Sequence, residues 1–145
     1  MIINKMTLTV PALSINEAFA RSVVSAFILP VDPTIQELAD VKTAVSEAVT
    51  NAVIHGYGDN NGLITIRAQL TNDAVFQIEI EDKGKGISDI PQALTPLYTS
   101  APHLERSGMG FTIMEQFTDN LVVDSKPGEG TKVRMVKKFN ARNIK

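Results

Sequence analysis

The amino-acid sequence predicts a two-layer α/β sandwich, in which helices cover one face of a mixed, mainly antiparallel β-sheet. Two observations carry this prediction. Two segments of the N-terminal half have apolar residues at helical spacing, and several later segments alternate apolar and polar residues between turn-forming residues. The 145 residues contain no internal repeat and no linker-like stretch, so we expect a single domain spanning residues 1–145.

One strand and one helix are expected first. The strand covers residues 6–10, and the helix opens with a capping box from Ser14 to Glu17. A rotation of 100° per residue divides the helix into two stripes. We expect the inward stripe to consist of Ile15, Ala18, Phe19, Val23 and Ala26. We expect the outward stripe to contain Glu17, Arg21, Val24 and Ile28.

The second expected helix is long and amphipathic. Asp32 is its expected cap, Pro33 occupies the first helical position, and Gly56 is the expected C-terminal cap. The apolar residues of this helix are Ile35, Leu38, Val41, Val45, Ala48, Val49 and Ala52.

A β-hairpin, a third helix and two more strands are expected in the rest of the chain. The hairpin joins residues 63–71 to residues 75–81 through Asn72 and Asp73. The later elements are a helix at 108–119, a strand at 121–124, the turn KPGEG, and a strand at 131–136.

The amino-acid composition argues against several classes of protein and of binding site. The absence of cysteine excludes a disulfide framework and a cysteine-based zinc site. No apolar run approaches the roughly 20 residues of a membrane span, and the N-terminus lacks a signal-peptide core, so we expect a cytoplasmic protein without a membrane partner. A net charge of −2 argues against direct nucleic-acid binding, although residues 132–145 carry six Lys or Arg and no acid.

The stretch DKGKG at residues 82–86 is the first candidate for chemistry. It is not a P-loop, because Glu79 stands where the first glycine of GxxxxGK[ST] belongs, and Gly86 stands where the Ser or Thr belongs. Period two in the preceding strand places Asp82 on the apolar side, where a carboxylate needs a donor from the protein or from a ligand. Alternatively, the strand ends earlier and Asp82 only starts a turn.

Two other stretches are candidates, and neither is specific alone. Glu47, Asn51 and His55 recur every four residues on the second helix, either as a solvated edge or as the lining of a cavity for a metal or phosphate. Gly108 and Gly110 in SGMGF open a helix, either as an anion site made of free backbone N–H groups or as an ordinary cap.

Taken in order along the chain, these stretches resemble the GHKL ATPase family with its Bergerat nucleotide fold. The matching features are ExxxN on a helix, DxGxG after a hairpin, a Ser/Thr-rich loop, GxG opening a helix, and GT starting a late strand. EAVTNAVIHGYG and PLYTSAPHLERSGMGFTIME are most similar to the bacterial anti-sigma factors that are also serine kinases. The resemblance covers nearly the whole chain.

The resemblance implies a site for ATP and Mg²⁺. Asp82 would accept a hydrogen bond from the adenine amino group, and Gly84 and Gly86 would make room for the ring. Asn51 would coordinate Mg²⁺, and Glu47 would act as the general base. The other nucleotide-binding residues would be Thr99, Ser107, Gly108, Gly110 and Thr131.

Residues 91–107 would form a nucleotide lid. A loop of this length between regular elements suggests a function by itself. Ala101 stands where the resemblance implies a basic lid residue, and His103 stands where it implies an acidic one. Arg106 is therefore the cation expected at the γ-phosphate, as a second catalytic residue.

The resemblance also implies two protein partners. The chain would bind and inhibit a sporulation sigma factor of the sigma F type, and would phosphorylate an anti-anti-sigma factor on serine, with ADP as product. It would form a homodimer, with Arg21 on a surface shared by both partners. Two alternatives are a nucleotide-dependent binding module without kinase activity and a detached histidine-kinase-type ATPase domain. The presence of Glu47 favours the kinase over the binding module.

Overall fold

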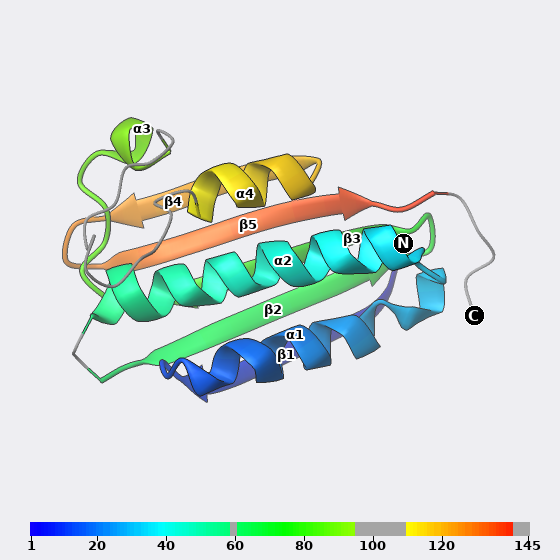
Figure 1. Ribbon diagram of the computed structural model, residues 1–145, viewed down its shortest axis with the longest axis horizontal. Helices are drawn as coiled ribbons and strands as arrows, with labels where there is room; N and C mark the ends of the chain where they lie inside the picture. Colours follow the sequence, from blue (N-terminus) through cyan, green and yellow to red (C-terminus); the bar gives the residue numbers. More distant parts are fainter. Residues whose placement is uncertain (59–60, 95–109, 141–145) are drawn as a thin grey trace.

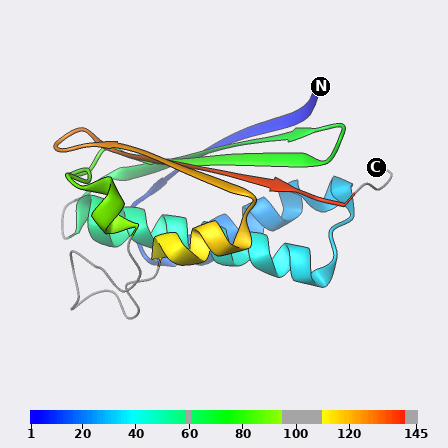
Figure 2. The same cartoon turned by 90° about the horizontal axis from the view of Figure 1, so that it is seen from above.

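The protein is built from two layers, a five-stranded sheet and a layer of helices packed on one of its faces (Figures 1 and 2). The computed structural model describes residues 1–58, 61–94 and 110–140. The strand order is β1-β2-β3-β5-β4, and each of the four neighbouring pairs is antiparallel. The predicted fold class is confirmed, with every strand pair among the described residues antiparallel rather than mixed.

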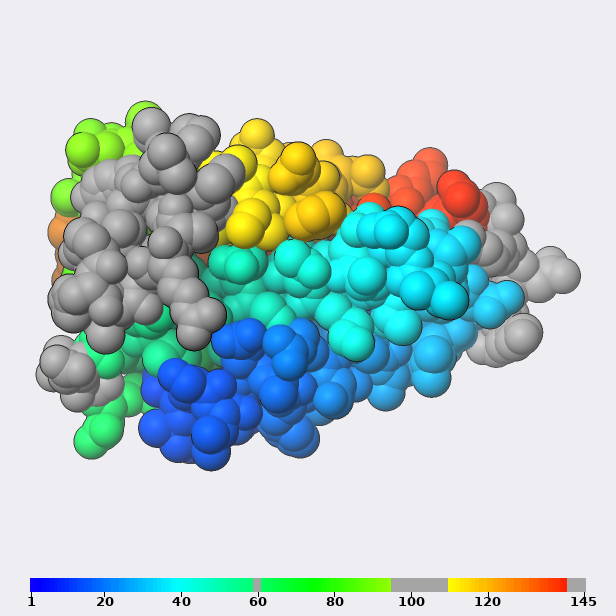
Figure 3. Space-filling view, viewed as in Figure 1, coloured from blue at the N-terminus to red at the C-terminus, as the bar shows by residue number. Residues whose placement is uncertain are grey.

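The strand predicted at 63–71 has the predicted bounds, and the other four strands extend beyond theirs. The strands are β1 (Ile2–Pro11), β2 (Leu63–Thr71), β3 (Val75–Asp82), β4 (Asn120–Lys126) and β5 (Gly130–Lys138). The helical segments are α1 (Ile15–Phe27), η1 (Leu29–Val31), α2 (Ile35–Asn51), η2 (Ala52–Tyr57), α3 (Ile90–Ala93) and α4 (Gly110–Phe117). In the space-filling view, α1, α2 and α4 lie side by side and cover the sheet (Figure 3).

Period two organises the sheet as predicted. On β3, Phe76, Ile78 and Ile80 are buried beneath the helices, whereas Glu79 and Glu81 alternate with them on the opposite face. Because one strand face is apolar and the other charged, a shift of one residue would bury the charges, so the register is strongly specified.

The predicted faces of α1 are wrong. Val24 and Ile28, which were expected to face solvent, are fully buried against the core. Ile15 is 77 % exposed and Phe19 is 49 % exposed, although both were assigned to the inward stripe. Both stripes of this helix carry aliphatic residues, so their spacing alone does not decide which one is buried.

The predicted capping box of α1 is also absent. The side chain of Ser14 makes no cap hydrogen bond. The Glu17 carboxylate instead accepts hydrogen bonds from Arg21 at 3.0 Å and from Thr50 of α2 at 2.8 Å. These contacts tie α1 to α2 because a carboxylate has lone pairs for several donors.

The second helix begins two residues later than predicted. Thr34 is the N-cap, and it forms a reciprocal capping box with Glu37. Asp32 adopts a left-handed conformation with φ of 51° and ends η1 instead. The predicted apolar face is otherwise confirmed from Val41 onward, whereas Ile35 in the first turn is exposed.

The end of this helix is a π-helical segment that the sequence did not predict. After Asn51 the chain continues as η2, and the C-cap is Gly58, with φ of 60°. The prediction that Gly56 caps the helix is therefore wrong, since Gly56 lies inside η2 and is buried. π-helical turns inside longer helices frequently occur at functional sites.

Several helices and strands begin or end at the same end of the molecule. The C-terminal ends of α2 and β3, the start of α4 and the turn between β4 and β5 all lie at the left of Figure 1, and both chain termini lie at the right. Among the described residues, no helix is long and apolar enough to cross a membrane.

Candidate functional site

Asp82 is a buried acid at the end of β3. Only 3 % of its surface is exposed, and it lies between Ile64 of β2 and Thr131 of β5 in the sheet. Its Oδ1 accepts a hydrogen bond from the backbone N–H of Gly84 at 2.9 Å. The prediction that Asp82 points to the apolar side is confirmed.

The environment of Asp82 works against its charged form. Burial raises the pKa of Asp82 above its usual value, although hydrogen bonds from the backbone N–H groups of Gly84 and Thr131 partly offset this effect. The neighbouring charge of Glu81 acts in the same direction as burial. A buried carboxylate that is expensive to ionise is a candidate acceptor for a ligand's hydrogen-bond donor.

Glycines allow two backbone segments, η2 and the loop after β3, to meet at this acid. A Cβ on Gly56 would lie 2.7 Å from the Asp82 carboxyl carbon, and one on Gly84 would lie 2.0 Å from the Gly56 carbonyl oxygen. The Lys85 N–H donates to that same carbonyl at 2.8 Å. Gly84 was predicted to make room for a ligand ring, and the structure adds that the loop can meet η2 only with glycine there.

The turn between β4 and β5 completes the surroundings of Asp82. Gly86 has φ of +75°, and a Cβ there would lie 2.0 Å from the Lys126 carbonyl oxygen. The Thr131 side chain is buried and lies 2.8 Å from the Ser125 hydroxyl, which also accepts the Ile87 N–H at 2.8 Å. Ser125 was not among the predicted site residues, because it follows the strand expected at 121–124, whereas β4 extends to Lys126.

The helical residues of the predicted site lie at the same end of the molecule. Glu47 and Asn51 are half-buried in the last two turns of α2, and His55 follows in η2. Gly110 is buried as the first residue of α4, which packs against α2. The structure thus brings together the chain segments that carry ExxxN, DxGxG and the start of the GxG helix (Figure 1).

Several predicted site residues lie outside the described residues. They are Thr99, Arg106, Ser107 and Gly108, together with Ala101 and His103. Of the predicted lid at 91–107, the described part is 91–94, which includes most of the short helix α3.

A pocket of about 180 Å³ lies over the ends of three strands. It is lined by Glu81, Asp82, Asp124, Ser125, Lys126, Glu129, Gly130, Thr131 and Lys132. Its lining residues belong to β3, to β4, to β5 and to the turn between β4 and β5, and none of them belongs to α2. The described part of the chain contains no cluster of three His, Asp or Glu side chains that could hold a metal.

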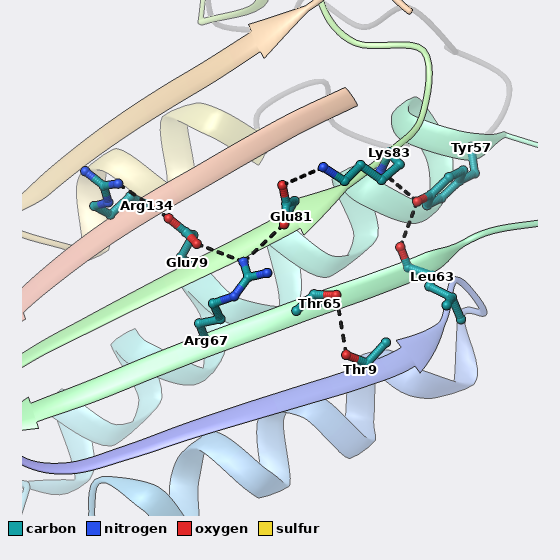
Figure 4. Close-up of polar contacts among 9 residues, drawn as sticks. All are labelled: Thr9, Tyr57, Leu63, Thr65, Arg67, Glu79, Glu81, Lys83 and Arg134. Atoms are coloured by element: carbon teal, nitrogen blue, oxygen red, sulfur yellow. Dashed lines mark hydrogen bonds and ion pairs between the residues drawn. The ribbon is translucent and has the colours of Figure 1, made fainter. Parts of the chain in front are cut away.

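The outer face of the same sheet carries a chain of ion pairs (Figure 4). Arg67 contacts Glu79 at 3.0 Å and Glu81 at 3.1 Å, while Lys83 contacts Glu81 and Arg134 contacts Glu79. Burial alone would raise the pKa of Glu81, but hydrogen bonds from Lys83 and Arg67 outweigh it and lower that pKa.

Arg21 is not placed as the helix periodicity predicted. Its side chain is 37 % exposed and lies between α1 and α2, where it donates to Glu17 at 3.0 Å and to Ser46 at 3.1 Å. The two aliphatic residues expected to flank it in solvent, Val24 and Ile28, are buried. Its predicted role in partner binding is untested by this geometry.

Comparison with known protein families agrees with the motif order. Residues 10–137 match the model of the histidine kinase-like ATPase domain. The chain is 59 % identical over 138 residues to the anti-sigma F factor of Clostridium botulinum, covering 94 % of this chain and 96 % of that protein. It is 55 % identical to the anti-sigma F factor of Clostridium acetobutylicum over 139 residues, with 96 % of each chain covered.

Solved structures share the fold at lower identity. The RsbU and RsbW domains of a Mycobacterium tuberculosis protein match with a TM-score of 0.68 at 18 % identity, covering 98 % of this chain and 35 % of that one. A histidine kinase domain from Erythrobacter litoralis matches with a TM-score of 0.56 at 19 % identity, covering 90 % of this chain and 62 % of that one.

Proposed function

The chain belongs to the histidine kinase-like ATPase domain family, and we propose that it is an ATP-dependent protein-serine kinase that also acts as an anti-sigma factor. It binds and inhibits a sporulation sigma factor of the sigma F type, and it inactivates an anti-anti-sigma factor by phosphorylating a serine. The names of relatives that are 54–59 % identical support the anti-sigma role. The observation that supports nucleotide binding most directly is the buried Asp82 carboxylate, held among glycine backbones.

Asp82 is the acceptor in this proposal. An adenine amino group has a donor for a carboxylate, and a bond to a charged acceptor is worth roughly 1.5–3 kcal/mol. Thr131 of β5 is the pairing partner of Asp82 in the sheet. In this proposal, Thr131 supports the same end of the base. Gly110 begins α4, so its end of the helix offers backbone N–H groups to the phosphates.

Asn51 and Glu47 are the proposed polar groups of α2. Asn51 would supply one amide oxygen to Mg²⁺, an ion that commonly keeps water and phosphate ligands and needs few from the protein. When bound, the ion would neutralise charge on the phosphates. Glu47 orients the serine hydroxyl and takes its proton, while the γ-phosphoryl group passes from ATP to the serine oxygen, yielding ADP and phosphoserine. Arg106 is the proposed cation at the γ-phosphate.

The partner surface in this proposal includes Arg21, in a homodimer. The arginine is held between α1 and α2 by Glu17 and Ser46 and still exposes over a third of its side chain. Ile15 and Phe19 are exposed apolar residues of the same helix. Arginine is enriched among interface hot spots, and here its side chain is already held in place.

Arg21→Ala is expected to weaken binding to the sigma factor or to the anti-anti-sigma factor by about 2 kcal/mol or more, without affecting ATP binding. Pull-downs with each purified partner measure the loss. Lys42→Ala, which removes an exposed cation from α2, serves as the control. Undiminished binding of Arg21→Ala to both partners would place their surface elsewhere.

Incubation with radiolabelled ATP, Mg²⁺ and the serine-bearing partner tests the kinase proposal. We expect label on a serine of the partner, and none when that serine is replaced by alanine. A partner that acquires no label but still binds the chain in a nucleotide-dependent way would instead indicate a binding module without kinase activity.

A further inference from the structure

The hydroxyl of Tyr57 joins three separate parts of the chain. It accepts a hydrogen bond from the backbone N–H of Lys83 at 2.7 Å, and it donates one to the carbonyl oxygen of Leu63 at 2.7 Å (Figure 4). Tyr57 is the last residue of η2, Leu63 is the first of β2, and Lys83 directly follows Asp82. One side chain therefore connects the π-helical segment, the start of β2 and the DKGKG loop.

The ring of Tyr57 is held as well as its hydroxyl. A Cβ on Gly62 would lie 2.2 Å from a ring carbon of Tyr57, so the chain just before β2 passes against the ring at a distance only glycine permits. The Tyr57 side chain is half-buried, and its hydroxyl uses one acceptor and one donor function in the two bonds. These contacts leave the hydroxyl little freedom to point elsewhere.

Two hydrogen bonds join η2 to the DKGKG loop, one on each side of the amide that contacts Asp82. Lys83 N–H is held by the Tyr57 hydroxyl, and Lys85 N–H is held by the Gly56 carbonyl at 2.8 Å. Between them, the Gly84 N–H donates to Oδ1 of Asp82. The direction of that donor, and with it the orientation of the carboxylate, depends on where the flanking residues are fixed.

We propose that Tyr57 is a positioning residue for base recognition, because it holds the DKGKG loop in the conformation that orients the Asp82 carboxylate. The inference rests on the proposed nucleotide site and deepens it. Tyr57 does not itself contact the base in this proposal. Its effect on nucleotide affinity passes entirely through Lys83, Gly84 and Asp82.

Tyr57→Phe tests the inference because it removes both hydrogen bonds and keeps the ring on Gly62. Calorimetry of ATP binding is expected to show about fivefold to tenfold weaker affinity, the effect of one to two ordinary hydrogen bonds. Thr65→Val is the matched control, since it removes a hydroxyl contact to Thr9 on the outer face of the sheet and should leave ATP affinity unchanged.

A double-mutant cycle separates positioning from general destabilisation. In an Asp82→Asn background, Tyr57→Phe is expected to cause less than a twofold further loss of affinity, because the carboxylate whose orientation it controls is gone. Fully additive losses would overturn the inference. So would an unchanged affinity of Tyr57→Phe in a preparation whose wild-type protein binds ATP. A wild-type protein that binds no ATP would overturn the proposed function itself, and the inference with it.

Amide exchange of the wild-type protein provides a test that does not depend on the folding of a variant. If the bond from Lys83 to Tyr57 is part of the binding-competent conformation, saturating ATP should slow exchange of the Lys83 amide by at least about tenfold. The Val75 amide, which is bonded to Thr71 at the other end of β3, should not change. Equal exchange of Lys83 with and without ATP would contradict the proposal.

Discussion

Two adjacent acids on β3, Glu81 and Asp82, point to opposite faces of one sheet and have opposite environments. Glu81 lies on the outer face, where the side chains of Arg67 and Lys83 pair with it and its pKa is lowered. Asp82 lies beneath the helix layer, where backbone N–H groups donate hydrogen bonds to it and burial raises its pKa. One step along a strand separates these two situations because successive side chains alternate in direction.

The different surroundings of Glu81 and Asp82 suit two different roles of a carboxylate. On the outer face, long cationic side chains satisfy the acid, so the pairs contribute modestly to stability and need no ligand. On the inner face, the neighbours are glycine backbones and the buried Thr131, which hold the acid but bring no positive charge. An acid that has no cationic partner among residues 1–58, 61–94 and 110–140 is suited to a donor that arrives with a ligand.

Glu47→Ala, in α2, is expected to have the largest effect of any change on the helix-covered side of the sheet. We expect phosphoryl transfer to the serine-bearing partner to fall by about 100-fold or more, with ATP affinity retained, because a general base acts mainly in the transition state. Rates with radiolabelled ATP and affinities by calorimetry measure the two quantities. Glu79→Ala, on the outer face, is the control and should transfer phosphate at the wild-type rate. A fully active Glu47→Ala protein would exclude Glu47 as the base.

Asp82→Asn and Glu81→Gln compare the two adjacent acids directly. The first should weaken ATP binding by about 1.5–3 kcal/mol through loss of a charged acceptor, whereas the second should leave affinity unchanged. Calorimetric titration of both variants provides the measurement. Equal affinities for the wild type and Asp82→Asn would remove the base-recognition role from this residue.

Much of this contrast could be predicted from the sequence. Alternation along residues 75–81 assigned both faces of β3 correctly, because a shift of one residue would exchange the apolar face and the charged face. The order of the motifs then indicated the family. What sequence patterns could not supply was contact between distant segments, such as the approach of Gly56 to Asp82 and the bond of Tyr57 to Lys83.

The helix predictions failed where two solutions satisfied the same pattern. On α1, Ile15 and Phe19 were as apolar as Val24 and Ile28, and only packing against α2 decides which pair is buried. The sequence of η2 contains ordinary helix-forming residues, so nothing local distinguishes its π-helical turn from a continued α-helix. Both misses concern tertiary contacts rather than local propensity.

Gly84→Ala tests whether the inner face depends on close backbone approach. We expect a loss of about 2 kcal/mol in the free energy of unfolding, because the added Cβ would overlap the Gly56 carbonyl. Gly128→Ala is the matched control, since Gly128 has φ of +78° but no atom within 4 Å of an added Cβ. Its cost should be the conformational strain alone, about 1 kcal/mol. Urea unfolding of both variants measures the difference, and equal losses would contradict the packing argument.

The smallest expected effect is a difference of sign in the pH dependence of stability. The folded-state pKa of Asp82 is raised above its usual value of 3.8, so the folded protein holds this proton more tightly and loses stability as pH rises from 3.8 through the raised pKa. The folded-state pKa of Glu81 is lowered from 4.5, so its contribution is present above pH 4.5 and is lost as pH falls through the lowered pKa.

Urea unfolding of the wild type, Asp82→Asn and Glu81→Gln between about pH 3 and pH 7 resolves the two contributions. The stability of the wild type relative to Asp82→Asn should fall as pH rises, and that relative to Glu81→Gln should rise. High salt should shrink the Glu81 difference, because Arg67 and Lys83 are solvent-exposed partners, and should leave the buried Asp82 difference largely intact. If both stability differences changed in the same direction with pH, Glu81 and Asp82 would share one environment. The contrast between the faces of β3 would then no longer stand.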